Sequence, residues 1–234
     1  MKRLICFDLD GTLTQHRSKL ETEHRLLLDK IGEKYKILMV GAGTTERIYK
    51  QMNEYPIDII GNYGMEESKI VDGKFAVIRR EKTEVDKAFF IEKIGYLRKK
   101  YGYENYAGET VEFHDTGMVT FPLLGTKARI EDKLAFDPTR EKRRVLYPEV
   151  KEIFKAYTVY IGGSSSFDFS LRQFNKYDAI MRYARENGYK KEEILYVGDD
   201  FGDGGGDSHV RLGGIDFINI EDYKTVKEKL FCLL

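Results

Sequence analysis

The chain has 234 residues, which is long enough for one full-sized hydrophobic core together with an inserted or second small domain. Its 39 basic and 39 acidic residues cancel, so no net charge draws the protein to nucleic acid or to a membrane surface, and we expect neither as a partner. The apolar run after Arg3 stops at Asp8, and no stretch reaches the length of a membrane span, so we expect no secretory or membrane segment. Two distant cysteines, Cys6 and Cys232, predict reduced thiols in a cytoplasmic protein.

The first 60 residues alternate between strand-like and helix-like hydrophobic patterns. The predicted elements are, in order, a strand at 4–7, a helix from the capping-box pair Ser18 and Glu21 to Gly32, a strand from about 36 to 40, a helix that begins near Thr44 and Thr45, and a strand at 57–60. This βαβαβ order implies crossover connections, and crossovers imply a parallel sheet.

The pattern changes after residue 61. Strand-like runs at 68–71 and 74–78 flank Asp72-Gly73, which predicts a hairpin. The segments that follow are a helix at 85–100, strand-like runs at 110–114, 118–123, 158–161 and 167–170, and a long polar helix near 139–157. Because strands and helices no longer alternate strictly, we expect an inserted α+β unit at 80–173.

Alternation resumes with a helix from Lys176, strands at 194–197 and near 217, and a last helix near 223–231. We therefore predict an α/β fold in two domains. Residues 1–79 and 174–234 form a Rossmann-like core on a parallel sheet, and residues 80–173 form an α+β cap. A basic cluster on the long cap helix, residues 140–144, is expected to be a solvated surface.

Three of the expected parallel strands run directly into acidic, hydroxyl or glycine residues. These segments are Asp8–Thr12, Gly41–Thr44 and Gly198–Asp207. Ligands of an open parallel sheet bind beyond the carboxyl ends of its strands, so we expect the three segments to form one site.

The acidic residues of these segments predict catalytic chemistry. Asp8 and Asp10 stand two residues apart, so one can attack as a nucleophile while the other serves as acid or base, although an Asp-x-Asp pair also occurs in purely structural turns. Asp199, Asp200 and Asp207 add further carboxylates. Carboxylates about 4 Å apart repel by roughly 4 kcal/mol at an effective dielectric constant of 20, so the site needs a cation or shifted pKa values. Hard oxygen ligands favour Mg²⁺.

With Asp8-Leu9-Asp10-Gly11-Thr12 as its first motif, the whole chain resembles the haloacid dehalogenase superfamily of phosphotransferases that carry a type II cap. The resemblance implies that Asp8 attacks phosphorus to form an aspartyl phosphate. Asp10 would protonate the leaving oxygen and then activate the next nucleophile. The resemblance also implies a Mg²⁺ ion held by Asp8, the Asp10 carbonyl oxygen and Asp199, with Asp207 completing the metal shell directly or through water.

Two further motifs of the superfamily have counterparts here. Gly43 stands where related sequences carry serine, so we assign the phosphate-binding hydroxyl to Thr44, together with the N–H groups of Ala42 and Gly43. The alternative is that Thr44 only caps the helix. The motif lysine, which neutralises phosphate and nucleophile, is Lys176, unless this residue is an ordinary surface lysine.

Within the superfamily the chain is similar to eukaryotic-type phosphomannomutases. The similarity includes Arg17, seven residues after Asp10, the spacing of Gly204–Asp207 from Asp199, and the segment Gly162-Gly163-Ser164-Ser165-Ser166-Phe167-Asp168. It implies that Arg17, Ser166 and Asp168 contact the substrate, and that the substrate is a phosphorylated sugar or a similar small metabolite.

The chain departs from the mutases at their second phosphate site. In place of three arginines it has His114, the pair Thr126-Lys127, and Lys133, and lysine lacks the bidentate fork of arginine. Weak distal binding favours attack by water, so we predict a Mg²⁺-dependent phosphohydrolase. The alternatives are a phosphomannomutase-like hexose phosphate mutase and, less favoured, a non-catalytic sugar-phosphate binding protein. Both a monomer and a homodimer are compatible with the sequence.

Overall fold

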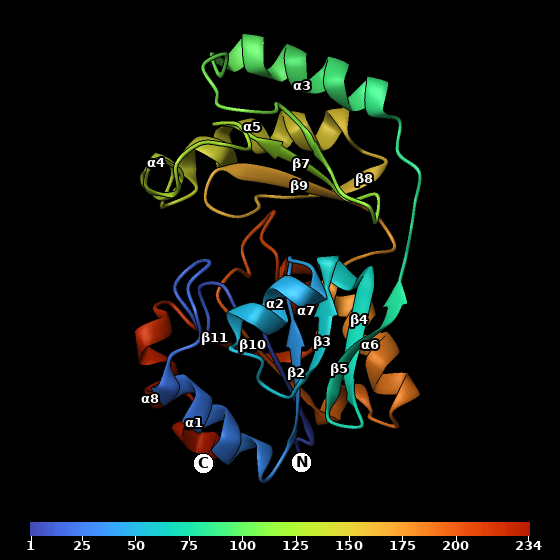
Figure 1. Cartoon of the computed structure of the whole chain (residues 1–234), viewed down its shortest axis with the longest axis vertical. Coiled ribbons are helices and arrows are strands. Elements are labelled where there is room, and N and C mark those ends of the chain that lie inside the picture. The colour runs from blue at the N-terminus through green and yellow to red at the C-terminus, as the bar shows by residue number, and fades with distance from the viewer. The chain divides into compact units, whose positions relative to one another are not determined.

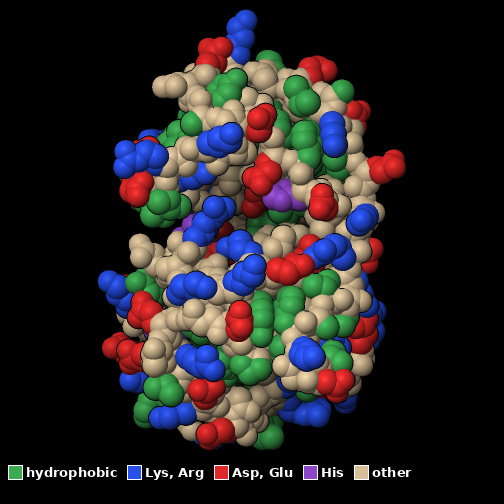
Figure 2. Space-filling model, viewed as in Figure 1, with side chains coloured by type: hydrophobic (Ala, Val, Ile, Leu, Met, Phe, Trp, Pro, Cys, Tyr) green, Lys and Arg blue, Asp and Glu red, His purple; other side chains and the backbone are tan.

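The computed structural model describes all 234 residues as two compact units (Figure 1). Residues 1–81 and 174–234 form the larger unit, and residues 82–173 form the smaller unit. The first boundary lies two residues beyond the predicted position 79, since strand β5 continues to Arg80. None of the helices combines the length and the apolar composition needed to cross a lipid bilayer. Figure 2 shows acidic and basic side chains interspersed over one face, in keeping with the zero net charge.

The larger unit is built on a seven-stranded sheet in the order β11-β10-β1-β2-β3-β4-β5. The parallel strands are β1 (Leu4–Phe7), β2 (Lys36–Val40), β3 (Asp58–Gly61), β10 (Ile194–Gly198) and β11 (Asp216–Asn219). The strands β4 (Glu66–Val71) and β5 (Lys74–Arg80) add an antiparallel hairpin at one edge. The predicted hairpin turn is confirmed, because Asp72 and Gly73 both have positive φ and connect Val71 to Lys74.

Helices cover both faces of this sheet, which is why its central strands are apolar throughout. Ile5 and Phe7 face a core that includes α1 (Thr22–Gly32), α2 (Thr45–Gln51) and α8 (Val226–Lys229). Leu4 and Cys6 face the other core, with α6 (Lys176–Glu186) and α7 (Ser208–Leu212). Short 3₁₀ turns lie at Asn62–Gly64, Lys191–Glu193, Tyr223–Thr225 and Phe231–Leu233. The predicted α/β fold is confirmed.

The predicted start of the first helix is wrong. Helix α1 begins at Thr22, and Glu21 occupies its N-cap without a side-chain bond. Ser18 instead donates its hydroxyl proton to the Gln15 carbonyl oxygen at 2.8 Å. Serine side chains bond readily to nearby backbone groups outside helices, so a turn takes the place of the capping box.

The smaller unit is an antiparallel sheet in the order β6-β7-β9-β8, as the predicted α+β unit requires. Its strands are β6 (Glu112–Phe113), β7 (Val119–Pro122), β8 (Tyr157–Tyr160) and β9 (Ser166–Leu171). Its helices are α3 (Lys87–Tyr101), α4 (Ile130–Phe136) and α5 (Glu141–Ile153). Alternate strand residues, among them Phe121, Phe167 and Phe169, pack with Phe90 of α3 and Leu146 of α5 in an aromatic-rich core.

We expected the basic cluster on α5 to be solvated, and this expectation is wrong for one residue, Arg143. This side chain is 1% exposed, and its Nε donates to Asp137 Oδ2 at 2.8 Å. Its Nη1 donates to the carbonyl oxygens of Gly162 at 2.7 Å and Gly163 at 3.0 Å. Arg143 shares its helix face with the buried Leu146, as the 3.6-residue period dictates. The arginine therefore ties α5 to the start of the segment 162–168.

Replacement of Arg143 by leucine is expected to destabilise the protein by roughly 3–5 kcal/mol, because the Asp137 carboxylate would stay buried without its partner. Urea unfolding followed by circular dichroism measures the change. Arg144→Leu is the matched control, since Arg144 is exposed on the same helix, and its effect should stay within about 0.5 kcal/mol. Equal losses in the two variants would rule out the buried pair as the cause.

Candidate active site

Three loops lie side by side at the carboxyl ends of parallel strands in the larger sheet. Strand β1 lies between β2 and β10 and is parallel to both, with Phe7 opposite Met39 on one side and Val197 on the other. The Asp8 N–H donates to the Val197 carbonyl oxygen at 2.9 Å. The loops that begin at Asp8, Gly41 and Gly198 therefore start side by side, as expected for one site at the carboxyl ends of parallel strands.

The centre of this site is a buried lysine. Lys176 Nζ donates to Asp8 Oδ1 at 2.6 Å, to Asp207 Oδ1 at 2.7 Å and to the Tyr196 hydroxyl oxygen at 3.1 Å. Tyr196 donates its own hydroxyl proton to Asp207 Oδ1 at 2.6 Å. Lys176 is 3% exposed, and it is the first residue of α6, capped by Asn175. The alternative of a surface lysine is wrong.

The two carboxylates beside Lys176 differ in how easily they ionise. Burial raises the pKa of Asp8 from 3.8 to about 6, although the Lys176 ammonium opposes the change. Burial alone would also raise the pKa of Asp207, but the Lys176 charge and hydrogen bonds from Lys176, Tyr196 and the Asp200 N–H outweigh it and lower that pKa. Burial would lower the pKa of Lys176, yet the two carboxylates raise it. Asp207 and Lys176 are thus a stable ion pair, whereas ionised Asp8 favours an additional cation.

The Asp10 carboxylate lies among donors from two other segments. Its Oδ1 accepts from the Arg17 backbone N–H and from Gln51 Nε2, both at 2.7 Å, and its Oδ2 lies 3.3 Å from Arg47 Nη1. Burial would raise the pKa of Asp10, but the charges of His16 and Arg47 and these hydrogen bonds lower it. Asp10 is therefore held as a carboxylate.

Sequence reasoning missed Arg47 and Gln51 as site residues. Both lie on α2, where Ile48 and Met52 indicated only the buried face. The available signal was their spacing of four residues on the first helix after β2, which places both side chains on one helix face. Arg47 Nη1 indeed donates to Gln51 Oε1 at 2.9 Å.

Asp199 contacts the loop that follows Asp8. Its Oδ1 accepts from the Thr12 hydroxyl at 3.1 Å. Gly11 has φ +96°, and a Cβ placed on it would lie 2.6 Å from Asp199 Oδ2, so glycine is required for this approach. No group of three or more His, Cys, Asp or Glu side chains is arranged to hold a metal ion. Asp207 accepts bonds on both oxygens, with its Oδ2 3.1 Å from the Asp200 nitrogen.

The expected phosphate-binding residues lie in the turn between β2 and α2. Thr44 is the N-cap of α2, and its hydroxyl oxygen accepts from the Arg47 N–H at 3.2 Å. Thr44 therefore caps α2, and a hydroxyl that accepts in this way still has a proton to donate. Ala42 and Gly43 are half-buried in the same turn. The Arg17 side chain is exposed, and it is its backbone that bonds to Asp10.

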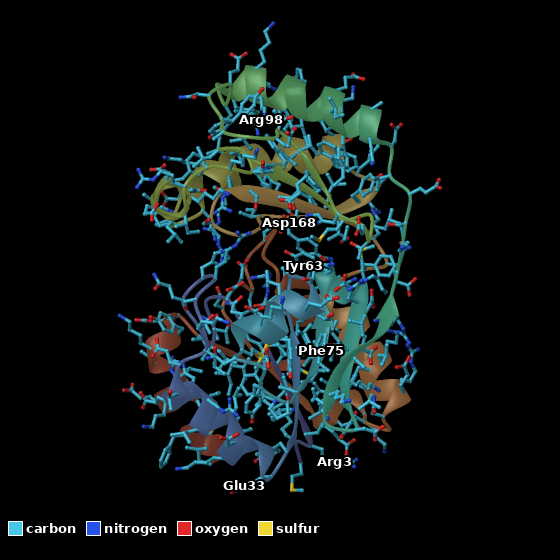
Figure 3. All side chains as sticks on the ribbon, in the orientation of Figure 1. Arg3, Glu33, Tyr63, Phe75, Arg98 and Asp168 are labelled. Atoms are coloured by element: carbon cyan, nitrogen blue, oxygen red, sulfur yellow. The ribbon has the colours of Figure 1, made fainter.

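The two remaining predicted residues, Ser166 and Asp168, belong to β9 of the smaller unit, where Figure 3 shows Asp168. They lie on the sheet face opposite Phe167 and Phe169, because strand residues alternate. Asp168 Oδ1 accepts from the Thr120 hydroxyl at 2.8 Å, and the Ser166 hydroxyl donates to the Gly162 carbonyl oxygen at 3.0 Å.

Comparisons with known proteins agree with this architecture. No protein-family model matches the chain. The chain is 28% identical to a phosphomannomutase of Drosophila melanogaster over 242 residues, which span 97% of this chain and 90% of that protein. A mutant of Plasmodium falciparum IMP-nucleotidase, solved with IMP bound, superposes with a TM-score of 0.69 at 16% identity, over 99% of this chain and 68% of its own. A haloacid dehalogenase-like hydrolase from B. subtilis superposes with a TM-score of 0.66 at 14% identity, over 93% and 88% of the two chains.

The raised pKa of Asp8 predicts a specific pH dependence of stability in the metal-free protein. Because the folded-state value of about 6 exceeds the ordinary 3.8, protonation of Asp8 favours folding. This contribution, on the order of 3 kcal/mol, is complete below about pH 4 and is lost as the pH rises through 6.

Urea unfolding between pH 4 and 7, with a chelator present, measures this contribution. Asp8→Asn should remove that part of the pH dependence. Asp72→Asn is the control, because Asp72 is exposed and Asn-Gly suits the same hairpin turn. Identical pH profiles for wild type and Asp8→Asn would contradict the prediction.

Proposed function

We propose a Mg²⁺-dependent phosphohydrolase activity for this chain, which is a haloacid dehalogenase superfamily member that resembles phosphomannomutases. Its substrate is a phosphorylated sugar or a similar small phosphomonoester. The observation that carries the proposal is the buried contact of Lys176 with Asp8 and Asp207, with Asp10 two residues further along the same loop. This arrangement supports phosphoryl transfer through a carboxylate nucleophile.

Asp8 is the proposed nucleophile. Lys176 holds its Oδ1, so Oδ2 is the oxygen left to attack phosphorus. Attack breaks the bond between phosphorus and the sugar oxygen and leaves a phosphoryl group on Asp8. The Lys176 charge stabilises the negative charge that gathers at this point.

Asp10 is the proposed acid and base. In its protonated form, which the lowered pKa makes the minor form, it gives a proton to the departing sugar oxygen in the first step. In the second step it takes a proton from the water that attacks the aspartyl phosphate, which releases inorganic phosphate and restores Asp8. Hydrogen bonds from Gln51 and the Arg17 backbone hold this carboxylate in place, and its lowered pKa favours the base form that the second step needs.

The residues around Asp8 fit a magnesium ion. Asp8 and Asp199 would hold the ion with carboxylate oxygens and Asp10 with its backbone carbonyl oxygen, the hard ligands that Mg²⁺ prefers. The close packing of Asp199 on Gly11 supports this set. Bound there, the ion would neutralise phosphoryl charge. Asp207 holds Lys176, and it would complete the metal shell directly or through water.

Substrate-binding residues are proposed in each unit separately. In the larger unit, the Thr44 hydroxyl and the N–H groups of Ala42 and Gly43 bind phosphate, and Arg17 assists from the surface. In the smaller unit, Ser166 and Asp168 bind sugar hydroxyl groups. Arg143 stiffens the segment that carries them by holding the Gly162 and Gly163 carbonyl oxygens.

A phosphomannomutase-like mutase is the second candidate, and the likeness to a phosphomannomutase over 97% of the chain favours it. A mutase must also grip a distal phosphate. Of the residues that replace the mutase arginines, His114 Nε2 lies 3.1 Å from the Thr120 hydroxyl, and Lys133 Nζ donates to the Thr126 carbonyl oxygen at 2.9 Å. What favours hydrolysis over mutase chemistry in this proposal is the replacement of the three arginines, because the residues in their place lack the bidentate fork. A non-catalytic binding protein would not need both Asp8 and Asp10.

Asp8→Asn should reduce phosphate release from sugar monophosphates by roughly 10³-fold or more, because the covalent route is lost. The measurement is a phosphate-release assay over a substrate panel with Mg²⁺, supported by circular dichroism to show that the variant folds. Asp72→Asn should keep the wild-type rate. A folded Asp8→Asn variant with wild-type turnover would refute the proposed nucleophile.

Removal of divalent ions with EDTA should abolish turnover, and added Mg²⁺ should restore it, because two of the proposed ligands are carboxylates that need a cation. The same samples, incubated with hexose 1-phosphate, discriminate between the two candidate activities. Release of inorganic phosphate without any hexose 6-phosphate supports the phosphohydrolase. Interconversion of the two hexose phosphates, stimulated by a bisphosphate, would establish the mutase instead.

A further inference from the structure

The turn between β2 and α2 is held from one side by the segment that follows β3. The Asn62 N–H donates to the Gly43 carbonyl oxygen at 2.8 Å, and the Tyr63 nitrogen lies 3.4 Å from the Gly41 carbonyl oxygen. Gly61, the last residue of β3, has no room for a side chain, because a Cβ there would lie 2.7 Å from the Gly43 carbonyl oxygen. The turn and the end of β3 are therefore in contact through their backbones.

These contacts fix the direction of two N–H groups in the turn. In a trans peptide bond the carbonyl oxygen and the N–H of the next residue point in opposite directions, and every peptide bond of the chain is trans. Since the carbonyl oxygens of Gly41 and Gly43 point towards the segment after β3, the N–H groups of Ala42 and Thr44 point away from it. Strand β2 lies between β3 and β1, so this direction leads to the loop that begins at Asp8. Neither N–H has an acceptor in the protein, and both residues are half-buried.

A buried carboxylate of β4 supports the same turn. Glu66 is the first residue of β4, where α2 packs over β3 and β4 (Figure 1), and it is 2% exposed. Its Oε2 accepts from the Thr45 N–H at 3.0 Å. Its Oε1 accepts from Asn62 Nδ2 at 3.1 Å and lies 3.2 Å from Arg80 Nε, which balances the buried charge. One carboxylate therefore joins the residue that follows the turn to the residue that holds it.

We propose that Glu66 is a positioning residue for phosphate binding. By fixing Thr45 and Asn62, it keeps the turn in the conformation in which the free N–H groups of Ala42 and Thr44 face the phosphate group of the substrate. The inference rests on the proposed function and adds to it a residue that touches no substrate. Glu66 must act through the turn, because both of its oxygens are occupied and its side chain is buried. Backbone donors that are already oriented bind an anion without the entropy loss of ordering the turn.

The next residue of the same strand, Glu67, provides a matched control. Its side chain is buried like that of Glu66, but the alternation of strand residues places it on the other face of the sheet. Neither of its carboxylate oxygens accepts a hydrogen bond, and Lys69 Nζ and Arg79 Nη1 lie 3.7 and 3.8 Å from them. Replacement of Glu67 therefore removes a buried carboxylate from β4 without touching the turn.

The test is a titration with inorganic phosphate in the presence of Mg²⁺, followed in amide NMR spectra. In the wild type the amide signals of Ala42 and Thr44 should shift as phosphate binds. Glu66→Leu should raise the Kd of phosphate about fivefold or more and reduce these shifts, because the turn loses its support. Glu66→Gln should recover part of the loss, since its amide oxygen can still accept from the Thr45 N–H. Glu67→Leu should change the Kd by less than about twofold.

The same spectra show whether each variant folds, and where Glu66→Leu does not, Glu66→Gln decides with a rise of about twofold or more. An unchanged Kd in the folded Glu66 variants, or an equal rise in Glu67→Leu, would overturn the proposal. So would wild-type spectra in which phosphate leaves the Ala42 and Thr44 signals unmoved.

The outcome for the proposed activity is read separately, from the substrate panel. Glu66-dependent phosphate binding without hydrolysis of any ester by the wild-type protein would reject the phosphohydrolase and retain the positioning role. Hydrolysis with an unchanged KM and phosphate Kd in Glu66→Leu would retain the phosphohydrolase and reject the positioning role.

Discussion

The buried ammonium group of Lys176, shared between Asp8 and Asp207, is the contact on which the site depends. It joins the first residue of α6 to the end of β1 and to the loop after β10, across 168 and 31 residues of sequence. Charges removed from water are tolerated only when they are paired and hydrogen-bonded. These three side chains can meet only because β10 lies beside β1 and α6 begins next to the ends of both strands. The fold therefore provides the pairing that the buried charges need.

The environments of Asp8 and Asp10 shift the pKa values of these two carboxyl groups in opposite directions. Burial dominates at Asp8 and raises its pKa, whereas His16, Arg47 and hydrogen bonds dominate at Asp10 and lower its pKa. A nucleophile needs the lower pKa and a general acid the higher one, so in the metal-free protein the direction of this separation is opposite to the proposed roles. A cation beside Asp8 would lower its pKa, and the roles are therefore assigned from position in the loop and not from these pKa values.

The two faces of the sheet in the smaller unit carry different side chains. Phe167 and Phe169 point into the aromatic core, while Ser166 and Asp168 point the other way from the same strand. Arg143 holds the backbone that leads into this strand from within the unit. A fold does not fix a reaction, so the proposed sugar contacts of Ser166 and Asp168 rest on these side chains and not on the fold.

The sequence by itself determined the parallel core, the hairpin at Asp72-Gly73 and the Asp8–Asp10 pair, because hydrophobic periodicity and turn residues act over a few neighbours. It placed the N-cap of α1 three residues early and Arg143 in solvent, since a local pattern shows neither competing turns nor distant carbonyl groups. Only the tertiary structure decided that Arg47 reaches Asp10 and that Asp207 holds Lys176. Long charged side chains span gaps between elements, and their partners are chosen by how those elements pack.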